Sequence, residues 1–129
     1  METTLRAALI DWLHADAILA GLVNSITEEA PSRVSPPWLA IAASASADWS
    51  TKDRRGREVR MAFELHCRGD APDTAFETMV AIQDRIEALP SAQAGFRIAS
   101  LAYLRGRIEL RSGNRRAVLI EYRFRLLAH

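Results

Sequence analysis

Residues 57–67 read REVRMAFELHC and decide the fold class of this chain. Apolar and polar side chains alternate through the whole stretch. A period of two is that of an extended strand, because successive side chains point to opposite faces of a sheet. The stretch therefore predicts a strand with one face in a hydrophobic core and the other in water. The expected core-facing side chains are Val59, Met61, Phe63, Leu65 and Cys67.

Three further strands are predicted around this one. Residues 38–47 form a weak strand of small side chains, and residues 95–110 and 115–127 form two strands at the end of the chain. Gly113 and Asn114 lie between the last two strands and tolerate positive φ, so this pair is expected to be a hairpin. The expected core-facing side chains of the last strand are Val118, Ile120, Tyr122, Phe124 and Leu126.

Three other segments have helical periodicity. The first ends near residue 14, the second is short and begins with Asp16 as its N-cap, and the third runs from about residue 73 to 89, where Pro90 stops it. Residues 23–37 are rich in turn-forming residues, with room for one short strand. The side chains expected to face the core from the third helix are Phe76, Met79, Val80, Ile82, Ile86 and Leu89.

This order of elements predicts an α+β fold: a mainly antiparallel sheet of four to five strands with helices packed on one face. A chain of 129 residues, 49% of them hydrophobic and 26% charged, is expected to form a single domain over residues 1–129. Its longest weakly polar run, residues 36–47, is too short to cross a bilayer, which needs about 20 apolar residues. Glu2 and Asp11 argue against a signal peptide, so we expect the protein to stay in the compartment where it is made.

No group of residues in the sequence indicates catalysis or metal binding. The histidines His14, His66 and His129 have no metal-ligand spacing, and His66 is expected on the water-facing side of its strand. No pair of carboxylates is placed to converge in a cleft. Cys67 is the single cysteine, which excludes an intrachain disulfide and fits a reducing interior. We therefore expect no enzyme, no catalytic residue, no cofactor and no metal.

Charge is unevenly distributed along the chain. Up to Ser50 there are two basic residues, Arg6 and Arg33, against six acidic ones; the remaining basic residues follow, and all but Lys52 are arginine. Arginine is enriched at protein interfaces. A basic stripe on DNA phosphate is an alternative reading. Interleaved carboxylates, and the lack of an aromatic series for stacking bases, make it the weaker one.

The connection between the strands 38–47 and 57–67 is longer than the usual hairpin turn. It contains Trp49 and the charged run KDRRGR at residues 52–57. In one reading it is a solvated loop, with Trp49 folded back over the edge of its own sheet. In the other, Trp49 covers another subunit, since Trp and Arg dominate the hot spots of interfaces. The residues alone leave both readings open.

The chain resembles the tail-completion family of long-tailed phages and of gene transfer agents, which are phage-like particles encoded in bacterial chromosomes. The resemblance rests on LRAALIDWLHADAILAGLV at residues 5–23, DWSTKDRRGRE at 48–58 before the alternating strand, the helix after RGDAP at 68–72, and the closing hairpin. Its most specific part is residues 48–52 followed by Gly56. It covers nearly the whole chain, in order.

The resemblance implies a tail terminator that forms a hexameric ring on the head-proximal end of the tail tube, ends tube growth and docks the head connector. The implied partners are further copies of the chain, the tail tube protein and the head-tail connector or stopper protein. At most non-specific contact with passing DNA is implied, and no membrane and no cofactor. Such a protein would act in the bacterial cytoplasm during assembly and then remain in the particle. The alternative is a DNA-contacting or generic protein-interaction domain of another complex.

Two groups of residues are expected to carry this function. A ring uses heterologous contacts between two different patches, which suits an acidic front part and a basic rear part of the chain. The residues expected at the interface with a neighbouring subunit or the tube are Trp49, Ser50, Thr51, Lys52, Arg54, Arg55 and Arg57. The residues expected to face the ring lumen or an acidic partner are Arg105, Arg107, Arg123 and Arg125.

Overall fold

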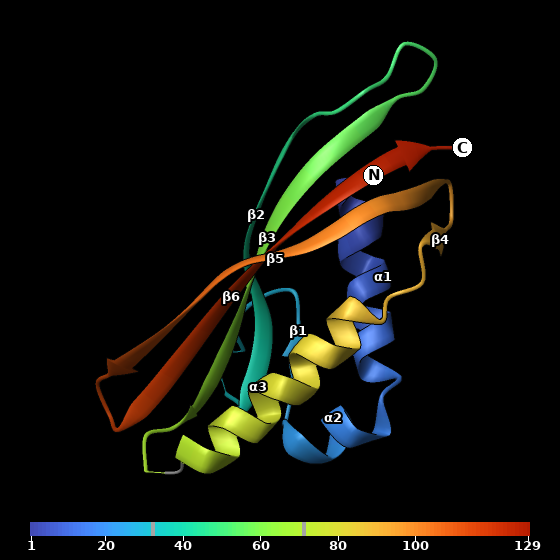
Figure 1. The fold of residues 1–129 in the computed structure, drawn as a ribbon. Coiled ribbons are helices and arrows are strands. Elements are labelled where there is room, and N and C mark those ends of the chain that lie inside the picture. The colour runs from blue at the N-terminus through green and yellow to red at the C-terminus, as the bar shows by residue number, and fades with distance from the viewer. Residues whose placement is uncertain (32, 71) are drawn as a thin grey trace.

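A computed structural model describes residues 1–31, 33–70 and 72–129 (Figure 1). The elements in chain order are α1 (Glu2–His14), α2 (Ala17–Leu22), β1 (Ile26–Thr27), β2 (Trp38–Asp48), β3 (Gly56–Arg68), α3 (Pro72–Glu87), β4 (Ala92–Gln93), β5 (Phe96–Arg111) and β6 (Arg115–Ala128). The four long strands and three helices lie where the sequence predicts them, with ends that differ by one or two residues.

These strands form one sheet in the order β1-β2-β3-β6-β5-β4. β1 pairs with β2 in parallel, and the other pairs are antiparallel. The prediction of an α+β fold with a mainly antiparallel sheet is confirmed, but the described sheet has six strands rather than four or five. β1 lies in the segment where the sequence left room for one short strand, and β4 is the strand that was not predicted. It has two residues and is too short to show a period.

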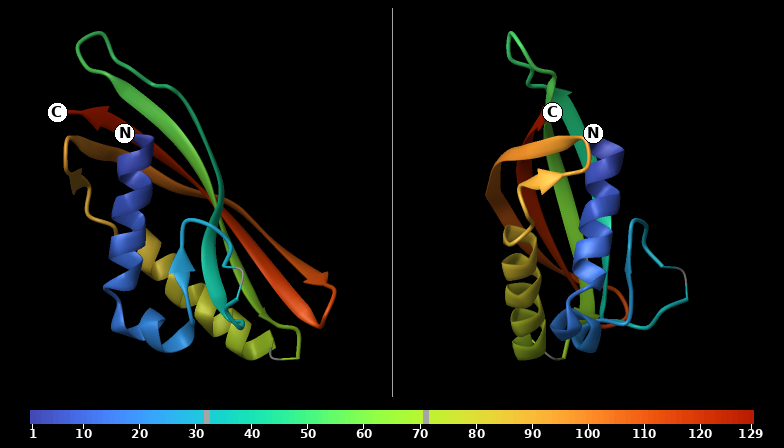
Figure 2. Two further views of the ribbon diagram at one scale, coloured as in Figure 1. Left: turned by 180° about the vertical axis from the view of Figure 1, so that it is seen from behind. Right: turned by 90° about the vertical axis from the view of Figure 1, so that its right-hand side faces the viewer.

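The core lies between the sheet and the helices, which pack on one of its faces (Figure 2). From α1, Leu5, Leu9 and Leu13 enter the core with at most 1% of their surface exposed. The predicted inward side chains of β3 and β6 are also buried. Removing one such side chain from water is worth about 1.5–3 kcal/mol, so these rows hold the helices against the sheet.

α3 buries a narrower stripe than its sequence predicts. Met79, Ile82 and Ile86 face the core as expected, but Phe76 is 70% exposed and Val80 is 37% exposed. The prediction that these two side chains face inward is wrong. Both lie to one side of the stripe that the buried residues follow along the helix. Apolar side chains beside a buried stripe make the apolar face of a helix look wider in the sequence than the face that packs against the core.

His66 is a second correction. The sequence predicts a water-facing position, whereas His66 is only 7% exposed and stacks on Trp38, with ring centroids 4.0 Å apart. The two residues are partners across the β2–β3 ladder. The His66 ring also contacts the carboxylate of Glu64. Cys67 points to the opposite face and into the core, as predicted. Alternation thus assigns a side chain to a face of the sheet but cannot say whether that face is covered there.

Truncation of Leu9 tests the docking of α1. Leu9→Ala is expected to lower the free energy of unfolding by about 2–5 kcal/mol, because it leaves a cavity in a fully buried position. Ile18→Ala, at a side chain 67% exposed on α2, is the control and should change it by no more than about 0.5 kcal/mol. Urea unfolding followed by circular dichroism measures both. Equal effects of the two changes would contradict the packing described here.

Candidate functional site

The predicted interface residues lie on the connection between β2 and β3, which projects beyond the rest of the sheet (Figure 1). We call residues 48–57 the arm. The Trp49 N–H donates a hydrogen bond to the Gly56 carbonyl at 3.0 Å, and the Thr51 N–H donates to the Arg54 carbonyl at 2.8 Å. The hairpin ladder therefore continues past the last residue of β2. The arm is a hydrogen-bonded extension of the sheet.

Side chains of the arm reinforce this turn. The Ser50 hydroxyl donates to the Asp48 carboxylate at 2.6 Å and accepts from the Gly56 N–H at 3.0 Å. The hydrogen bond from Ser50 lowers the pKa of Asp48 below its ordinary value. The Thr51 hydroxyl accepts from the Arg54 N–H at 3.0 Å. The most specific part of the family resemblance is therefore, in this structure, a set of residues that shape a turn.

Trp49 packs against its own chain. It is half-buried, and the guanidinium carbon of Arg125 on β6 lies 5.5 Å from the centroid of its ring. This is within the distance at which a cation and an aromatic face attract each other. Within the single chain described, Trp49 therefore contacts its own sheet through Arg125, and part of its ring stays exposed.

Gly56 lies where the arm meets the sheet and leaves no room for a side chain. A Cβ atom at Gly56 would be 2.5 Å from the Trp49 carbonyl oxygen and 2.8 Å from that of Leu126. Both are backbone atoms, which cannot move without shifting a strand. Glycine is required here by the close approach of three segments.

A methyl group at Gly56 tests this junction. Gly56→Ala is expected to lower the free energy of unfolding by about 1–3 kcal/mol, because the new methyl must displace backbone atoms. Gly21→Ala is the matched control. A Cβ at Gly21 has no neighbour within 4 Å, and alanine in place of a helical glycine should stabilise by up to about 1 kcal/mol. Chemical unfolding of both variants gives the comparison, and a Gly56→Ala protein as stable as wild type would contradict the crowding.

The tip of the arm is basic and open to solvent. Lys52, Arg54, Arg55 and Arg57 are exposed, and Asp53 is the acidic residue among them. The structure thus brings the predicted interface residues together on one projecting hairpin. Within it, the Ser50 and Thr51 side chains hold the turn, Trp49 is half-buried beside Arg125, and the basic side chains extend into water.

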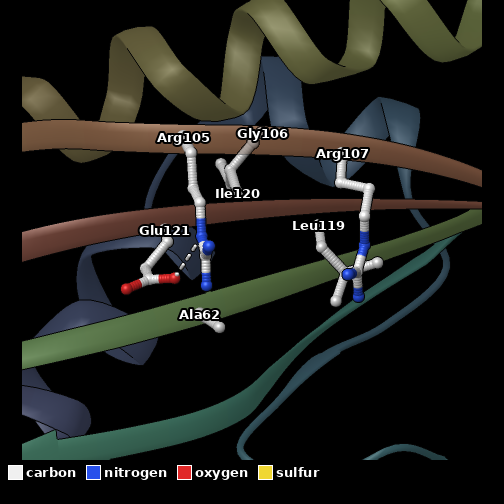
Figure 3. A pocket seen from close by; sticks show the side chains of 7 residues that line it. All are labelled: Ala62, Arg105, Gly106, Arg107, Leu119, Ile120 and Glu121. Atoms are coloured by element: carbon white, nitrogen blue, oxygen red, sulfur yellow. Dashed lines mark hydrogen bonds and ion pairs between the residues drawn. The ribbon is translucent and has the colours of Figure 1, made fainter.

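The second predicted group lies on the face of the sheet opposite to the helices. Figure 3 shows Arg105 and Arg107 extending from β5 across β6, where they line a pocket. The Nε atom of Arg105 lies 3.1 Å from the carboxylate of Glu121, and that of Arg107 lies 2.9 Å from Glu109. Each guanidinium has a carboxylate neighbour, which reduces its local field. We call this surface the arginine face.

Arg125 connects the arginine face to the arm. Its Nε atom lies 3.0 Å from the Glu58 carboxylate, and the same guanidinium faces the Trp49 ring. The hydrogen bond from Arg125 is the largest cause that lowers the pKa of Glu58, and the charge of Arg60 adds less. The Nε of Arg123 is buried and has no hydrogen-bond partner among the described residues. The two predicted groups therefore form one continuous surface.

A titration tests the Arg125–Glu58 pair. Arg125→Gln is expected to raise the pKa of Glu58 toward its ordinary value of 4.5, whereas Arg60→Gln should raise it less. The folded-state pKa lies below the unfolded one. The pair therefore stabilises the fold above the unfolded pKa, and this contribution is lost as pH falls through the folded pKa. Nuclear magnetic resonance of the Glu58 carboxyl carbon measures the shift. An unchanged pKa in Arg125→Gln would contradict the assigned cause.

Sequence reasoning missed an exposed apolar surface near the β5–β6 turn. Ile108 and Leu110 are 62% and 74% exposed there, and Tyr103, farther back on β5, is 47% exposed. Ile108 is the register partner of Val118, so it lies on the helix-facing side of the sheet. The turn of this hairpin projects past the start of α3, so the described helices do not cover it (Figure 1). The alternation of apolar and charged residues in 106–111 places Ile108 and Leu110 on one face of the strand. It does not tell whether another segment covers that face.

Among residues 1–31, 33–70 and 72–129, His, Cys, Asp and Glu side chains nowhere gather in threes that could hold a metal ion. The helices in these ranges are also too short or too polar to cross a membrane.

Comparison with known proteins identifies the family. Residues 7–127 match the family described as "Tail completion protein gp17". The curated proteins contain no match to this chain. Among solved structures, a chain from "Virion of native gene transfer agent (GTA) particle" has the same fold, with a TM-score of 0.82 and 24% sequence identity over 98% of this chain and 97% of that chain. The family match covers nearly the whole sequence, so the chain belongs to the tail completion protein gp17 family of structural phage-tail proteins.

Proposed function

We propose that this protein is a tail terminator, which forms a ring on the head-proximal end of the tail tube, ends tube growth and docks the head connector. Family membership supports a structural role in tail assembly. The observation that carries the finer proposal is the arm, a hydrogen-bonded hairpin with a basic tip that projects from the sheet. A projecting element of this kind can reach a neighbouring subunit or the tube while its own fold stays intact.

Charge supports a heterologous contact between the arm and the helices of another copy. In a ring, two different patches of each subunit meet. Exposed carboxylates on α1 and α3 can face the arm's Lys52, Arg54 and Arg55, and opposite charges favour correct docking. These carboxylates are Asp11, Asp73, Glu77, Asp84 and Glu87. Most of these carboxylates lie on α3, which belongs to the rear part of the sequence.

We place the arginine face toward the ring lumen or an acidic partner. Arg105, Arg107 and Arg125 each have a carboxylate within 3.1 Å, so their charge is largely balanced at short range. A face of this kind supports weak, sequence-independent contact with passing DNA rather than tight binding. The proposed mechanism is assembly without turnover or cofactor, first in the bacterial cytoplasm and then as part of the particle.

Charge reversal at the tip tests the arm. Arg54→Glu combined with Arg55→Glu is expected to raise the concentration at which rings form by about tenfold or more, because each change replaces an attraction by a repulsion. Arg33→Glu changes an exposed arginine outside the arm and serves as the control. Light scattering over a concentration series, with electron microscopy of the largest species, should show closed wild-type rings. The family resemblance implies about six subunits per ring.

Removal of Trp49 gives a second readout. Trp49→Ala takes away the ring that lies beside Arg125, and loss of a hot-spot tryptophan costs about 2 kcal/mol or more of binding free energy. Full assembly by both the charge-reversed protein and Trp49→Ala would overturn the role of the arm. If the wild-type chain is monomeric at every concentration, the same variants are compared for binding to ends of purified tail tubes.

A further inference from the structure

The sheet has two long edges that the described strands leave uncovered. β1 pairs only with residues 39–40 of β2, and β4 pairs only with residues 96–97 of β5. Beyond them, residues 43–48 of β2 and 105–111 of β5 have a strand partner on one side only within the described chain. Both stretches are regular, because the irregularities in register precede them. Unpaired edges are templates for another strand.

The register shows which backbone groups of β2 point outward. The Trp49 N–H donates to the Gly56 carbonyl, so these two residues form a hydrogen-bonded pair. Bonded and non-bonded pairs alternate along an antiparallel ladder. Counting back from Trp49, Ser44, Ser46 and Asp48 direct their N–H and C=O groups away from β3. The side chains between them are small and exposed: Ala43, Ala45 and Ala47.

Strand directions allow these two edges to meet in a ring. Three successive antiparallel pairs separate β2 from β5, so the two strands run in opposite directions. When copies stand in the same orientation around an axis, β2 of one copy and β5 of the next are therefore antiparallel. This contact joins two different patches of the chain, as a closed ring requires. It would also extend the sheet in the same way as its existing pairs.

The two edges carry opposite charge. Three acidic residues, Glu2, Glu28 and Glu29, and one basic residue, Arg6, lie beside the β2 edge. Arg6 fixes this group in place, because its Nε lies 3.0 Å from Glu28 and its Nη1 donates to the Ser44 hydroxyl at 2.7 Å. The neighbourhood of the β2 edge is therefore acidic.

The β5 edge is basic and partly apolar. Of its own charged side chains three are basic, Arg105, Arg107 and Arg111, and one is acidic, Glu109. Glu121 on β6 and Glu64 on β3 lie 3.1 Å from Arg105 and 3.3 Å from Arg111, so they offset part of this positive charge. On the other face of the same stretch, Ile108 and Leu110 are exposed. A strand laid along this edge would bring apolar atoms next to both side chains. Charge complementarity and uncovered apolar surface both favour the acidic β2 edge as the occupant.

We propose that the free edge of β2 in one copy pairs with the free edge of β5 in the next, so that the sheets of neighbouring subunits join. This inference rests on the proposed ring and names the strands that close it. The occupant of each edge is a second copy of this chain. The arm then strengthens a contact whose core is a backbone ladder.

A proline at Ser46 tests the ladder. Ser46→Pro removes an outward N–H and leaves the hydrogen bonds to β3 in place, a position where an edge strand tolerates proline. It is expected to raise the concentration needed for assembly by about tenfold, the effect of losing one to two hydrogen bonds. Ser46→Ala is the control, since it also loses the hydroxyl but keeps the N–H. Its assembly should match wild type, and circular dichroism checks that both variants are folded.

Hydrogen exchange locates the contact directly. The amides of Ser44, Ser46 and Asp48 should exchange quickly in the monomer and about tenfold or more slowly in the assembled protein. Assembly without this protection, or normal assembly of Ser46→Pro, would overturn edge pairing and leave the terminator proposal standing. A wild-type chain that stays monomeric even with tail-tube ends would overturn both.

Discussion

The pairing of β3 with β6 is the constraint on which the rest of the molecule depends. It places apolar partners side by side on one face: Val59 with Phe124, Met61 with Tyr122, Phe63 with Ile120 and Leu65 with Val118. The helices must cover this face, because leaving it in water would forfeit most of the hydrophobic stabilisation. Even the hydroxyl of Tyr122 has a partner there, a Glu87 carboxylate oxygen 2.7 Å away. Because the described helices cover one face of the sheet (Figure 2), the other face and both edges remain free for contacts with other subunits or proteins.

The long strands and the helices could be predicted because their two sides differ in chemistry and the difference repeats at a fixed period. The errors share one physical origin. His66, Phe76 and Val80 were each assigned from a local pattern, whereas their exposure depends on distant segments. His66 is covered by Trp38 from another strand, and Phe76 lies where no described segment reaches. A period identifies a face, and only the tertiary structure decides what covers it.

The candidate site divides in the same way. Its composition drew attention to the arm, and the structure gathers those residues on one hairpin. The different roles of these residues could not be predicted from the sequence, because they depend on Arg125. Arg125 lies far along the chain and is brought beside Trp49 by the pairing of β3 with β6. The motif that best marks the family shapes the turn, and the less distinctive basic tip carries the charge. The residues that identify the family and the residues proposed to bind a partner can thus be neighbours in one hairpin and still have different roles.

The position of Cys67 has a consequence for a protein carried in a released particle. Under the proposed function, such a particle would pass from the reducing cytoplasm in which it assembles to oxidising surroundings. This chain has one thiol, which is 5% exposed in the core, and burial raises its pKa. Since the thiolate is the reactive form, the thiol is shielded both by its neighbours and by its protonation. The covalent structure of the subunit is therefore insensitive to a change from reducing to oxidising surroundings.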